Sequence, residues 1–587
     1  MNILGISCFY HDAAAALIQN GQLIAASEEE RFSRIKHDSD FPEKAIEFCL
    51  KMGKIRPEEV AFVVFYEKPF LKFERMLTMM LETYPRSHKV FRESMISWFG
   101  KKFWVKDRIQ SFLGLSDEKI LFSEHHLSHA ASAFLCSPFE EAAILTVDGV
   151  GEWATATFSH GRASFDGKRE NRIDIKKEIH FPHSLGLLYS AFTAFLGFEV
   201  NEGEYKIMGM AAYGSPRYTD EIYQIIRVVN DGSFWLDMDY FDFACQTEIP
   251  LTRKFIQKFG QPRQPEDDFF LDGGRTENGK RNQYYADIAA SIQRVTEEVM
   301  VHLAKVLYAE TSTENVCISG GVGYNGLANA RVLEETPFKA LYLHPAAGDS
   351  GGAIGAALWA YHILFQKPRV FVMDHCYWGE SYSNEEITQR LSSMGVSYQK
   401  IDDEQQLLRQ VAEALARQEV IGWFQGRAEW GPRALGNRSI LADPRDVRMK
   451  AIVNEKIKFR ELFRPFAPSV LDERKGEFFN LPQGKESLAT DFMLLIPTVV
   501  ESKRKEIPAV THEDGTARLQ TVKEQTNPKY HRLIQEFEKV SGVPMLLNTS
   551  FNLKGEPIVN SPEEALRTFS RGALDRLILG NCIVTRK

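Results

Sequence analysis

The start of the chain alternates apolar runs with short turns. Residues 2–28 contain two apolar runs followed by Asn20-Gly21, the strongest short signal for a β-hairpin. The pattern returns in residues 142–165, where an apolar strand leads through a small-residue turn into a strand pair expected to close at His160-Gly161. Because the two segments have nearly equal spacing, the sequence predicts an internal duplication of one hairpin-led α/β unit.

Two later junctions, in residues 315–332 and 342–360, carry glycines where a strand ends and a helix begins. Such junctions let backbone N–H groups face a phosphate or a metal. Duplicated α/β units opened by hairpins are also how the actin, sugar-kinase and heat-shock ATPase (ASKHA) superfamily is built, and this fold-level analogy predicts a nucleotide cleft. The expected nucleotide contacts at the first junction are Gly320, Gly321, Gly323 and Asn325.

An uncharged apolar run, residues 184–198, falls short of the ~20 residues that a membrane span needs and therefore predicts a buried helix. The segment directly after it, residues 201–210, combines acids, a lysine and glycines. Lys206 and Gly209 are candidates for holding the ribose and phosphates of a nucleotide. A solvated turn is the alternative for this segment.

The helical period is lost after Gln366, and a new amphipathic helix begins near Asn384. We therefore expect two domains, residues 1–368 and 369–587. The second is a further α/β region, with strands at 420–424 and 543–548 and helices at 402–418 and 562–571.

Composition narrows the function classes. The 587 residues are 44% hydrophobic and 26% charged, typical of a globular protein too long for one core. A net charge of −8 disfavours binding to nucleic acid, which requires an excess of positive charge. No leader or membrane span is expected. The seven cysteines never form a C-x-x-C pair, which argues against a disulfide framework and a zinc knuckle and favours the cytoplasm.

A histidine-rich segment, residues 123–129, predicts a helix start capped by Ser123. His125 and His129 would share one helix face, and two imidazoles at that spacing can bind one metal if carboxylates complete the set. Asp148 ends a strand-like run, Asp349 lies in the glycine-rich turn of residues 348–352, and these two are the candidate carboxylates. A His2Asp2 site suits iron, zinc or manganese. The alternatives are that these side chains only cap helices and turns, or that His126 replaces His125.

The second domain contains a basic cluster. Ten Lys or Arg residues lie between Arg427 and Arg464 against five acids, and several are next to turn-forming residues. This placement favours a concave anion site over a solvated helix face, because arginine binds oxyanions bidentately. Ser550 and Asn552 follow an apolar strand and could bind a phosphate, with an Asx or Ser turn as the alternative.

Taken in order, many segments resemble the NodU/CmcH-type O-carbamoyltransferase family across essentially the whole chain. The matching segments are HDAAAAL, EEERFSRIKHDSDFP, HHLSHAASAFLCSPF, FPHSLGLLYSAFTAFLGF, GEYKIMGMAAYG, SGGVGYN, HPAAGDSGGAIGAAL, GRAEWGPRALGNRSILADPR, FRPFAPSVL, DGTARLQTV and NTSFNLKGEPIV. Departures from the family pattern include Ala13 after the His-Asp pair and Met210-Ala211-Ala212.

The resemblance implies an ASKHA-type first domain like the tRNA threonylcarbamoyl-transfer subunit, followed by a YrdC-like α/β domain. The second domain would make carbamoyl-adenylate from carbamoyl phosphate and ATP with Mg, and the first would pass the carbamoyl group to the hydroxyl of a small-molecule acceptor. It also implies a set of site residues. His125, His129, Asp148 and Asp349 would bind a divalent metal, iron by resemblance; Arg433, Lys458, Arg464, Arg518, Ser550 and Asn552 would hold carbamoyl phosphate and the adenylate; His11 and Asp12 would be catalytic beside the acceptor.

His11 is the candidate general base for the acceptor hydroxyl, or a group that only hydrogen-bonds a ligand. One rival function is tRNA threonylcarbamoylation, which the acidic chain disfavours. Another is hydrogenase maturation, whose zinc-knuckle cysteines are absent. A third is a nucleotide-gated binding module of the actin or heat-shock type, for which the basic cluster would have no purpose.

Overall fold

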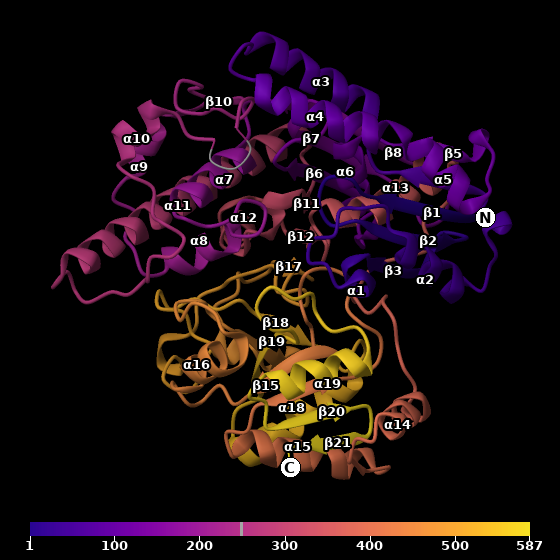
Figure 1. Ribbon diagram of the computed structural model, residues 1–587, viewed down its shortest axis with the longest axis vertical. Helices are drawn as coiled ribbons and strands as arrows, with labels where there is room; N and C mark the ends of the chain where they lie inside the picture. The colour runs from indigo at the N-terminus through magenta and orange to yellow at the C-terminus, as the bar shows by residue number, and fades with distance from the viewer. Residues whose placement is uncertain (247–249, 587) are drawn as a thin grey trace. The chain divides into compact units, whose positions relative to one another are not determined.

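The computed structural model describes residues 1–246 and 250–586, which group into two compact units. The first unit comprises Met1–Ile24, Ser39–Val372 and Gly484–Glu486, and the second comprises Ala25–Asp38, Met373–Gln483 and Ser487–Lys587 (Figure 1). The grouping of residues 25–38 with the second unit was not anticipated from the sequence. A short contact explains it: the guanidinium of Arg31 donates to Gly431 O at 2.8 Å, and Gly431 N donates to Glu28 at 2.8 Å.

Two sheets of the same design form the centre of the first unit. The first has the strand order β3-β2-β1-β4-β5, and the second contains the run β8-β7-β6-β11-β12. In each, the first three strands are antiparallel and the last two run parallel to the third. The strands are β1 (Asn2–Ser7), β2 (Ala14–Gln19), β3 (Gln22–Glu28), β4 (Phe62–Phe65), β5 (Ile120–Phe122), β6 (Glu141–Val147), β7 (Ala154–Arg162), β8 (Arg172–His180), β11 (Asn315–Ser319) and β12 (Ala340–Leu343), with a separate ribbon of β9 (Ile226–Val228) and β10 (Phe234–Leu236).

The repeated strand order confirms the predicted duplication, and the first hairpin turn lies where the sequence placed it. Asn20 and Gly21 join β2 to β3 with φ angles of 50° and 85°, the left-handed backbone that a tight hairpin requires. The second predicted turn is wrong, because His160 and Gly161 lie inside β7. A Cβ on Gly161 would lie 2.7 Å from the ring of Phe134, so this glycine serves close packing rather than a turn.

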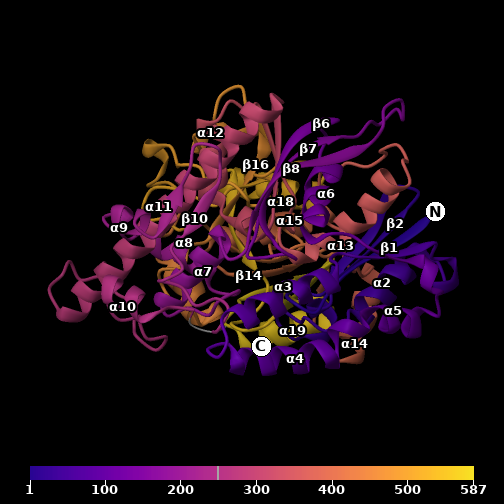
Figure 2. The same ribbon diagram turned by 90° about the horizontal axis from the view of Figure 1, so that it is seen from above.

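Helices cover both sheets of the first unit (Figure 2). The run at 184–198 forms a largely buried helix, α7, as predicted, and the structure adds that Ser184 is its N-cap. None of the described helices is long and apolar enough to cross a membrane. The helices are α2 (Glu43–Gly53), α3 (Pro69–Glu82), α4 (His88–Gly100), α5 (Val105–Leu113), α6 (His125–Cys136), α7 (Leu185–Phe195), α8 (Glu204–Ala211), α9 (Thr219–Tyr223), α10 (Arg253–Phe259), α11 (Glu277–Thr311), α12 (Gly326–Glu335) and α13 (Asp349–Leu358).

Helices α6 and α13 pack directly against each other. Their close approach depends on Gly355, because a Cβ there would lie 1.9 Å from the backbone oxygen of Ser128 in α6. Both helices are almost completely buried, and each has a polar side chain in its first turn. The packing of α13 on α6 therefore sets the distance between those polar groups.

The second unit is built on one mixed sheet with the order β13-β21-β20-β14-β15-β19-β16-β18. Alternate residues of its central strands enter two separate cores: Ile421, Trp423 and Leu441 join one, and Phe424 and Ile440 join the other. This period of two places a hydrophobic core on each face of the sheet.

The elements of the second unit follow the predicted segments closely. Its helices are α1 (Glu30–Ser33), α14 (Asn384–Ser393), α15 (Glu404–Ala416), α16 (Met449–Ile452), α17 (Lys475–Phe478), α18 (Pro528–Ser541) and α19 (Pro562–Arg571). Its strands are β13 (Gln399–Lys400), β14 (Ile421–Phe424), β15 (Arg438–Ala442), β16 (Ala467–Leu471), β18 (Gln520–Val522), β19 (Met545–Ser550), β20 (Arg576–Leu579) and β21 (Cys582–Thr585). The helix expected near Asn384 and the strands expected at 420–424 and 543–548 are confirmed, whereas the YrdC-like fold stays a prediction.

Candidate metal centre and anion site

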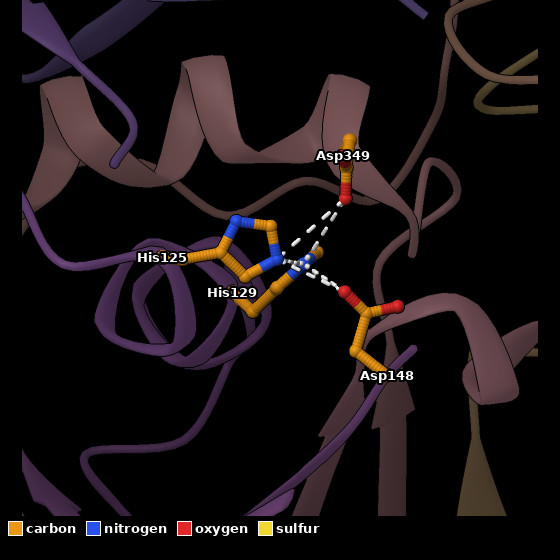
Figure 3. Close-up of side chains that lie close together, drawn as sticks. All are labelled: His125, His129, Asp148 and Asp349. Carbon is orange, nitrogen blue, oxygen red and sulfur yellow. Dashed lines mark hydrogen bonds and ion pairs between the residues drawn. The ribbon is translucent and has the colours of Figure 1, made fainter. Parts of the chain in front are cut away.

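Four side chains of the first unit converge on one point. His125 and His129 come from the first turns of α6, Asp148 follows the last residue of β6, and Asp349 is the first residue of α13. Figure 3 shows their imidazole and carboxylate groups directed toward one another. One ligand atom from each lies within 4.8 Å of the other three.

The spacing of these atoms fits a metal ion. His125 Nε2 lies 2.9 Å from Asp148 Oδ2 and 3.7 Å from Asp349 Oδ1, and His129 Nε2 lies 3.4 and 3.6 Å from the same two atoms. The two Nε2 atoms are 3.1 Å apart. Ligands bound to one metal at about 2.0–2.2 Å are separated by about 2.8–3.6 Å, so the observed spacing is that of a coordination shell. The nitrogen and oxygen donors suit a divalent transition metal.

The electrostatics of the centre also favour a cation. Burial alone would lower the pKa of His125, but Asp349, Asp148 and Glu67 raise it to about 10. Burial would likewise raise the pKa of Asp148, but the two imidazoles hold it well below its usual range. Two charged imidazoles 3.1 Å apart repel each other. One divalent cation bound by neutral imidazoles satisfies the same carboxylates without that repulsion.

A second layer of polar groups orients the imidazoles. His125 Nδ1 lies 3.7 Å from Glu67 Oε2, and His129 Nδ1 lies 3.4 Å from Ser319 Oγ. The backbone N–H of Gly321 donates to Asp148 Oδ1 at 2.9 Å. A proton on Nδ1 that faced these oxygens would leave Nε2 of each imidazole available to bind a metal, as in known metal sites.

The competing histidine, His126, is directed elsewhere. Its Nδ1 lies 2.6 Å from Thr146 Oγ1 on β6, and burial together with the two neighbouring imidazoles lowers its pKa well below the usual range. The start of α6 differs from the prediction, because its N-cap is Glu124 and not Ser123. Glu152 supplies the missing cap: its carboxylate accepts the N–H of His125 at 3.0 and 3.1 Å.

The predicted catalytic pair lies in a strained loop. His11 Nδ1 lies 2.8 Å from Asp12 Oδ2, and Phe9 and Asp12 both have left-handed backbone, with φ of 72° and 45°. Burial lowers the pKa of His11, but Asp12 and then Asp349 outweigh it and raise the pKa to about 9. Since Asp349 acts on it electrostatically, His11 belongs to the surroundings of the candidate metal centre.

The predicted nucleotide contacts have mixed surroundings. Gly320, with φ of 93°, and Gly321 follow β11 and pack against Val147 and Asp148, and Gly323 follows in the next turn. Asn325 caps α12 and exchanges side-chain hydrogen bonds with Gln293. Lys206 and Gly209 lie within the helix α8, whereas residues 201–203 before it form a turn. Nucleotide binding by these residues stays a prediction.

In the second unit, Lys458 is buried in a cage of oxygens. Its Nζ donates to Ser550 O at 2.7 Å and Oγ at 3.1 Å, and to Asn552 O at 3.0 Å and Oδ1 at 2.6 Å. Burial, followed by Arg460 and Arg464, lowers the pKa of Lys458 well below its usual range. Arg433 and Arg518 are half-buried in the same unit. An anion bound at this place would relieve the crowding of positive charge.

Part of the predicted basic cluster has a different role. Arg438 is fully buried and donates to the backbone oxygens of Gln425 and Glu380, with its guanidinium 3.6 Å from the ring centre of Phe424. Arg427 donates to the backbone oxygens of Gly379 and Trp378. These arginines tie loops together, so the expectation that the whole cluster lines an anion site was too broad.

Comparison with known proteins places this geometry in a family. The family described as "Carbamoyltransferase N-terminus" matches residues 2–358, and "Carbamoyltransferase C-terminus" matches residues 412–586. The chain therefore belongs to the carbamoyltransferase family and is a carbamoyltransferase.

Similar proteins support this assignment along nearly the full chain. Nodulation protein NolNO of Sinorhizobium fredii is 36% identical over 99% of this chain and 79% of its own length. Nodulation protein NolO of Bradyrhizobium diazoefficiens is 37% identical over 79% of each chain. Uncharacterized protein sll1178 of Synechocystis sp. is 45% identical over all of this chain and 97% of its own.

Several residues of the centre were not singled out from the sequence. Glu67 comes two residues after β4, and Glu152 lies four residues after Asp148. Ser319 is the last residue of β11. Each lies at or soon after the end of a strand, and that position is the signal that could have identified them.

Proposed function

We propose that this carbamoyltransferase forms carbamoyl-adenylate from carbamoyl phosphate and ATP and transfers the carbamoyl group to a hydroxyl of a small molecule. The observation that supports the proposal is that one chain contains two chemically different groups of residues. One is the buried Lys458 with Ser550 and Asn552, and the other is the His2Asp2 group, with His11 in its surroundings. The first suits phosphate chemistry, and the second suits acyl transfer to an alcohol.

The adenylation step needs cations that hold phosphate oxygens. Water cleaves carbamoyl phosphate into phosphate and carbamate, and a carbamate oxygen then bonds to the α-phosphorus of ATP as pyrophosphate leaves. Lys458 and Arg464 would neutralise the charge that develops on the phosphoryl oxygens. Ser550 and Asn552, which now bond Lys458, would turn to the substrate, with Arg433 and Arg518 as further contacts.

In the transfer step, the acceptor oxygen forms a bond to the carbamoyl carbon, and the bond to the phosphate oxygen of AMP breaks. His11 takes the proton of the acceptor hydroxyl, and Asp12 holds its imidazole through Nδ1. A divalent metal held by His125, His129, Asp148 and Asp349 would supply Lewis-acid polarisation of an oxygen in this centre. The loop of residues 9–12 keeps His11 in place through its constrained backbone.

The test is a product analysis. The protein is incubated with ATP, Mg, carbamoyl phosphate and a panel of hydroxylated metabolites, and mass spectrometry is used to find products that have gained one carbamoyl group. We expect at least one such product, formed only when both ATP and carbamoyl phosphate are present. Carbamoylation without ATP would contradict the adenylate route. Carbamoylation of tRNA instead of small molecules would favour the RNA-modifying alternative.

A further inference from the structure

A stripe of positive charge on α3 faces the candidate metal centre. Lys68, Lys72 and Arg75 are spaced four and three residues apart and therefore lie on one side of the helix and its N-cap. Lys68 Nζ lies 2.7 Å from Glu124 Oε1, and Lys72 Nζ lies 2.5 Å from Glu67 Oε2. The two lysines are thus paired with carboxylates that flank α6 and the metal ligand His125.

The third cation of the stripe differs. Within residues 1–246 and 250–586, Arg75 makes no hydrogen bond and no close ion pair, and its Nε is inaccessible to solvent. Its guanidinium rests 4.9 Å from the ring centre of Phe181, which positions it without satisfying any of its N–H donors. Burial is the largest influence on its pKa, which is lowered. Leaving the buried Nε donor unpaired is costly, and the guanidinium carries further N–H donors beside it.

The surroundings of Arg75 connect it to the reaction centre. The charged and polar groups that act on it electrostatically are Tyr10, Glu67 and Glu152. Tyr10 directly precedes His11, and its ring lies 4.5 Å from Lys72 Nζ. Glu67 is the neighbour of His125 Nδ1 at 3.7 Å, and Glu152 caps the helix that carries His125. Arg75 therefore lies within electrostatic range of groups that surround His11 and His125.

We propose that Arg75 binds an oxyanion, a carboxylate or phosphate, of the acceptor molecule, which makes the natural acceptor a hydroxylated anion. This inference rests on the proposed function and specifies its substrate class. Lys72 pairs with Glu67, and the Glu152 carboxylate accepts the N–H of His125, so both carboxylates near Arg75 already have other partners and its guanidinium can bind an anion from outside the protein. The planar fork of a guanidinium matches a carboxylate or phosphate with two parallel hydrogen bonds.

The phosphate of the adenylate is the other possible source of an oxyanion near His11, and binding measurements separate the two. Isothermal titration calorimetry compares galacturonate with galactose, and glycerol 3-phosphate with glycerol, on the full-length wild type. AMP serves as the probe for the adenylate phosphate. The variant is Arg75→Gln, which keeps side-chain length and removes the charge. The matched control is Arg92→Gln, an exposed arginine of α4.

We expect the wild type to bind at least one anionic probe about 10-fold more tightly than its neutral counterpart. This is the gain in affinity expected from one charge-assisted hydrogen-bonded pair. Arg75→Gln should remove this preference and leave AMP binding within about 2-fold, and Arg92→Gln should retain the preference. Absence of any anionic preference in the wild type, or its persistence in Arg75→Gln, would overturn the proposal. So would a loss confined to AMP, because Arg75 would then serve the adenylate.

Binding of these probes does not depend on turnover, so the proposed function is tested separately. Carbamoyl-phosphate-dependent pyrophosphate release by the wild type is measured on the same preparation. Its absence would count against the proposed function and leave the binding result standing. If a product is found in the metabolite panel, Arg75→Gln should raise the KM for that acceptor about 10-fold or more, and Arg75→Lys should recover part of the loss.

Discussion

Replacing Asp12 with Asn tests how His11 works. The Asp12 carboxylate, 2.8 Å from His11 Nδ1, is the main cause that raises the pKa of His11 to about 9 against the burial that lowers it. Asn keeps the shape of the side chain and, like Asp, tolerates the left-handed backbone at this position, where φ is 45°. The substitution therefore removes the charge with little change of structure.

The expected magnitude follows from the two pKa values. At pH 7 an imidazole with a pKa of about 9 is only about 1% neutral, whereas one with the ordinary value of about 6.5 is about 75% neutral. If neutral His11 is the base, the acceptor-dependent rate must rise with pH and level off above the pKa of His11. Without the Asp12 charge, the midpoint of this rise should fall by more than about one pH unit. A cation bound at Asp349 lowers the midpoint in both proteins and preserves the difference.

The assay is the pH profile of kcat for carbamoyl transfer, measured from about pH 5.5 to about pH 10 so that it covers both pKa values of His11. Asp231→Asn, an exposed carboxylate in the turn before β10, is the control and should leave the midpoint unchanged. Carbamoyl-phosphate-dependent pyrophosphate release is followed in parallel, because it does not involve His11. An unchanged midpoint in Asp12→Asn, or a rate that falls as pH rises through the same range, would refute the role of His11 as base.

Two further predictions concern the metal centre. His129→Asn should abolish stoichiometric binding of a divalent metal, measured by elemental analysis after dialysis. His126→Asn should retain it, because His126 bonds Thr146. Equal loss of metal in both variants would contradict the assignment of ligands. In Gly355→Ala the added Cβ would lie 1.9 Å from Ser128 O and push α13 away from α6. We therefore expect metal binding to weaken about 10-fold or more and the free energy of unfolding to fall by about 1–3 kcal/mol. Gly100→Ala, which meets nothing within 4 Å, is its control, and unchanged metal binding in Gly355→Ala would show that α6 and α13 do not set the ligand spacing.

Much of the architecture could be predicted from the sequence. Strand periodicity and the Asn20-Gly21 turn predicted the repeated α/β unit, because both signals depend only on residues close together in the sequence. The His125 and His129 spacing identified one helix face for the same reason. The buried helix α7 could likewise be predicted from its uncharged apolar run.

Other features depend on contacts between distant segments. Gly161 resembles a turn residue but is required by the ring of Phe134, and the cap of α6 comes from Glu152 instead of the neighbouring Ser123. Arg438 looks like a substrate contact, yet its donors are consumed by backbone oxygens. The unpaired state of Arg75 could not be predicted at all, since it follows from which carboxylates the two lysines of its stripe occupy.

The central claim is that activation and transfer use separate sites, and exchange of labelled pyrophosphate into ATP tests it most directly. In the presence of carbamoyl phosphate and without acceptor, the wild type and His11→Asn should both catalyse the exchange. Lys458→Met should lose it, and Lys456→Met, an exposed neighbour, should not. His11→Asn should nevertheless fail to carbamoylate an acceptor. If His11→Asn loses exchange together with Lys458→Met, or if Lys458→Met retains it, the account of two separate sites is wrong.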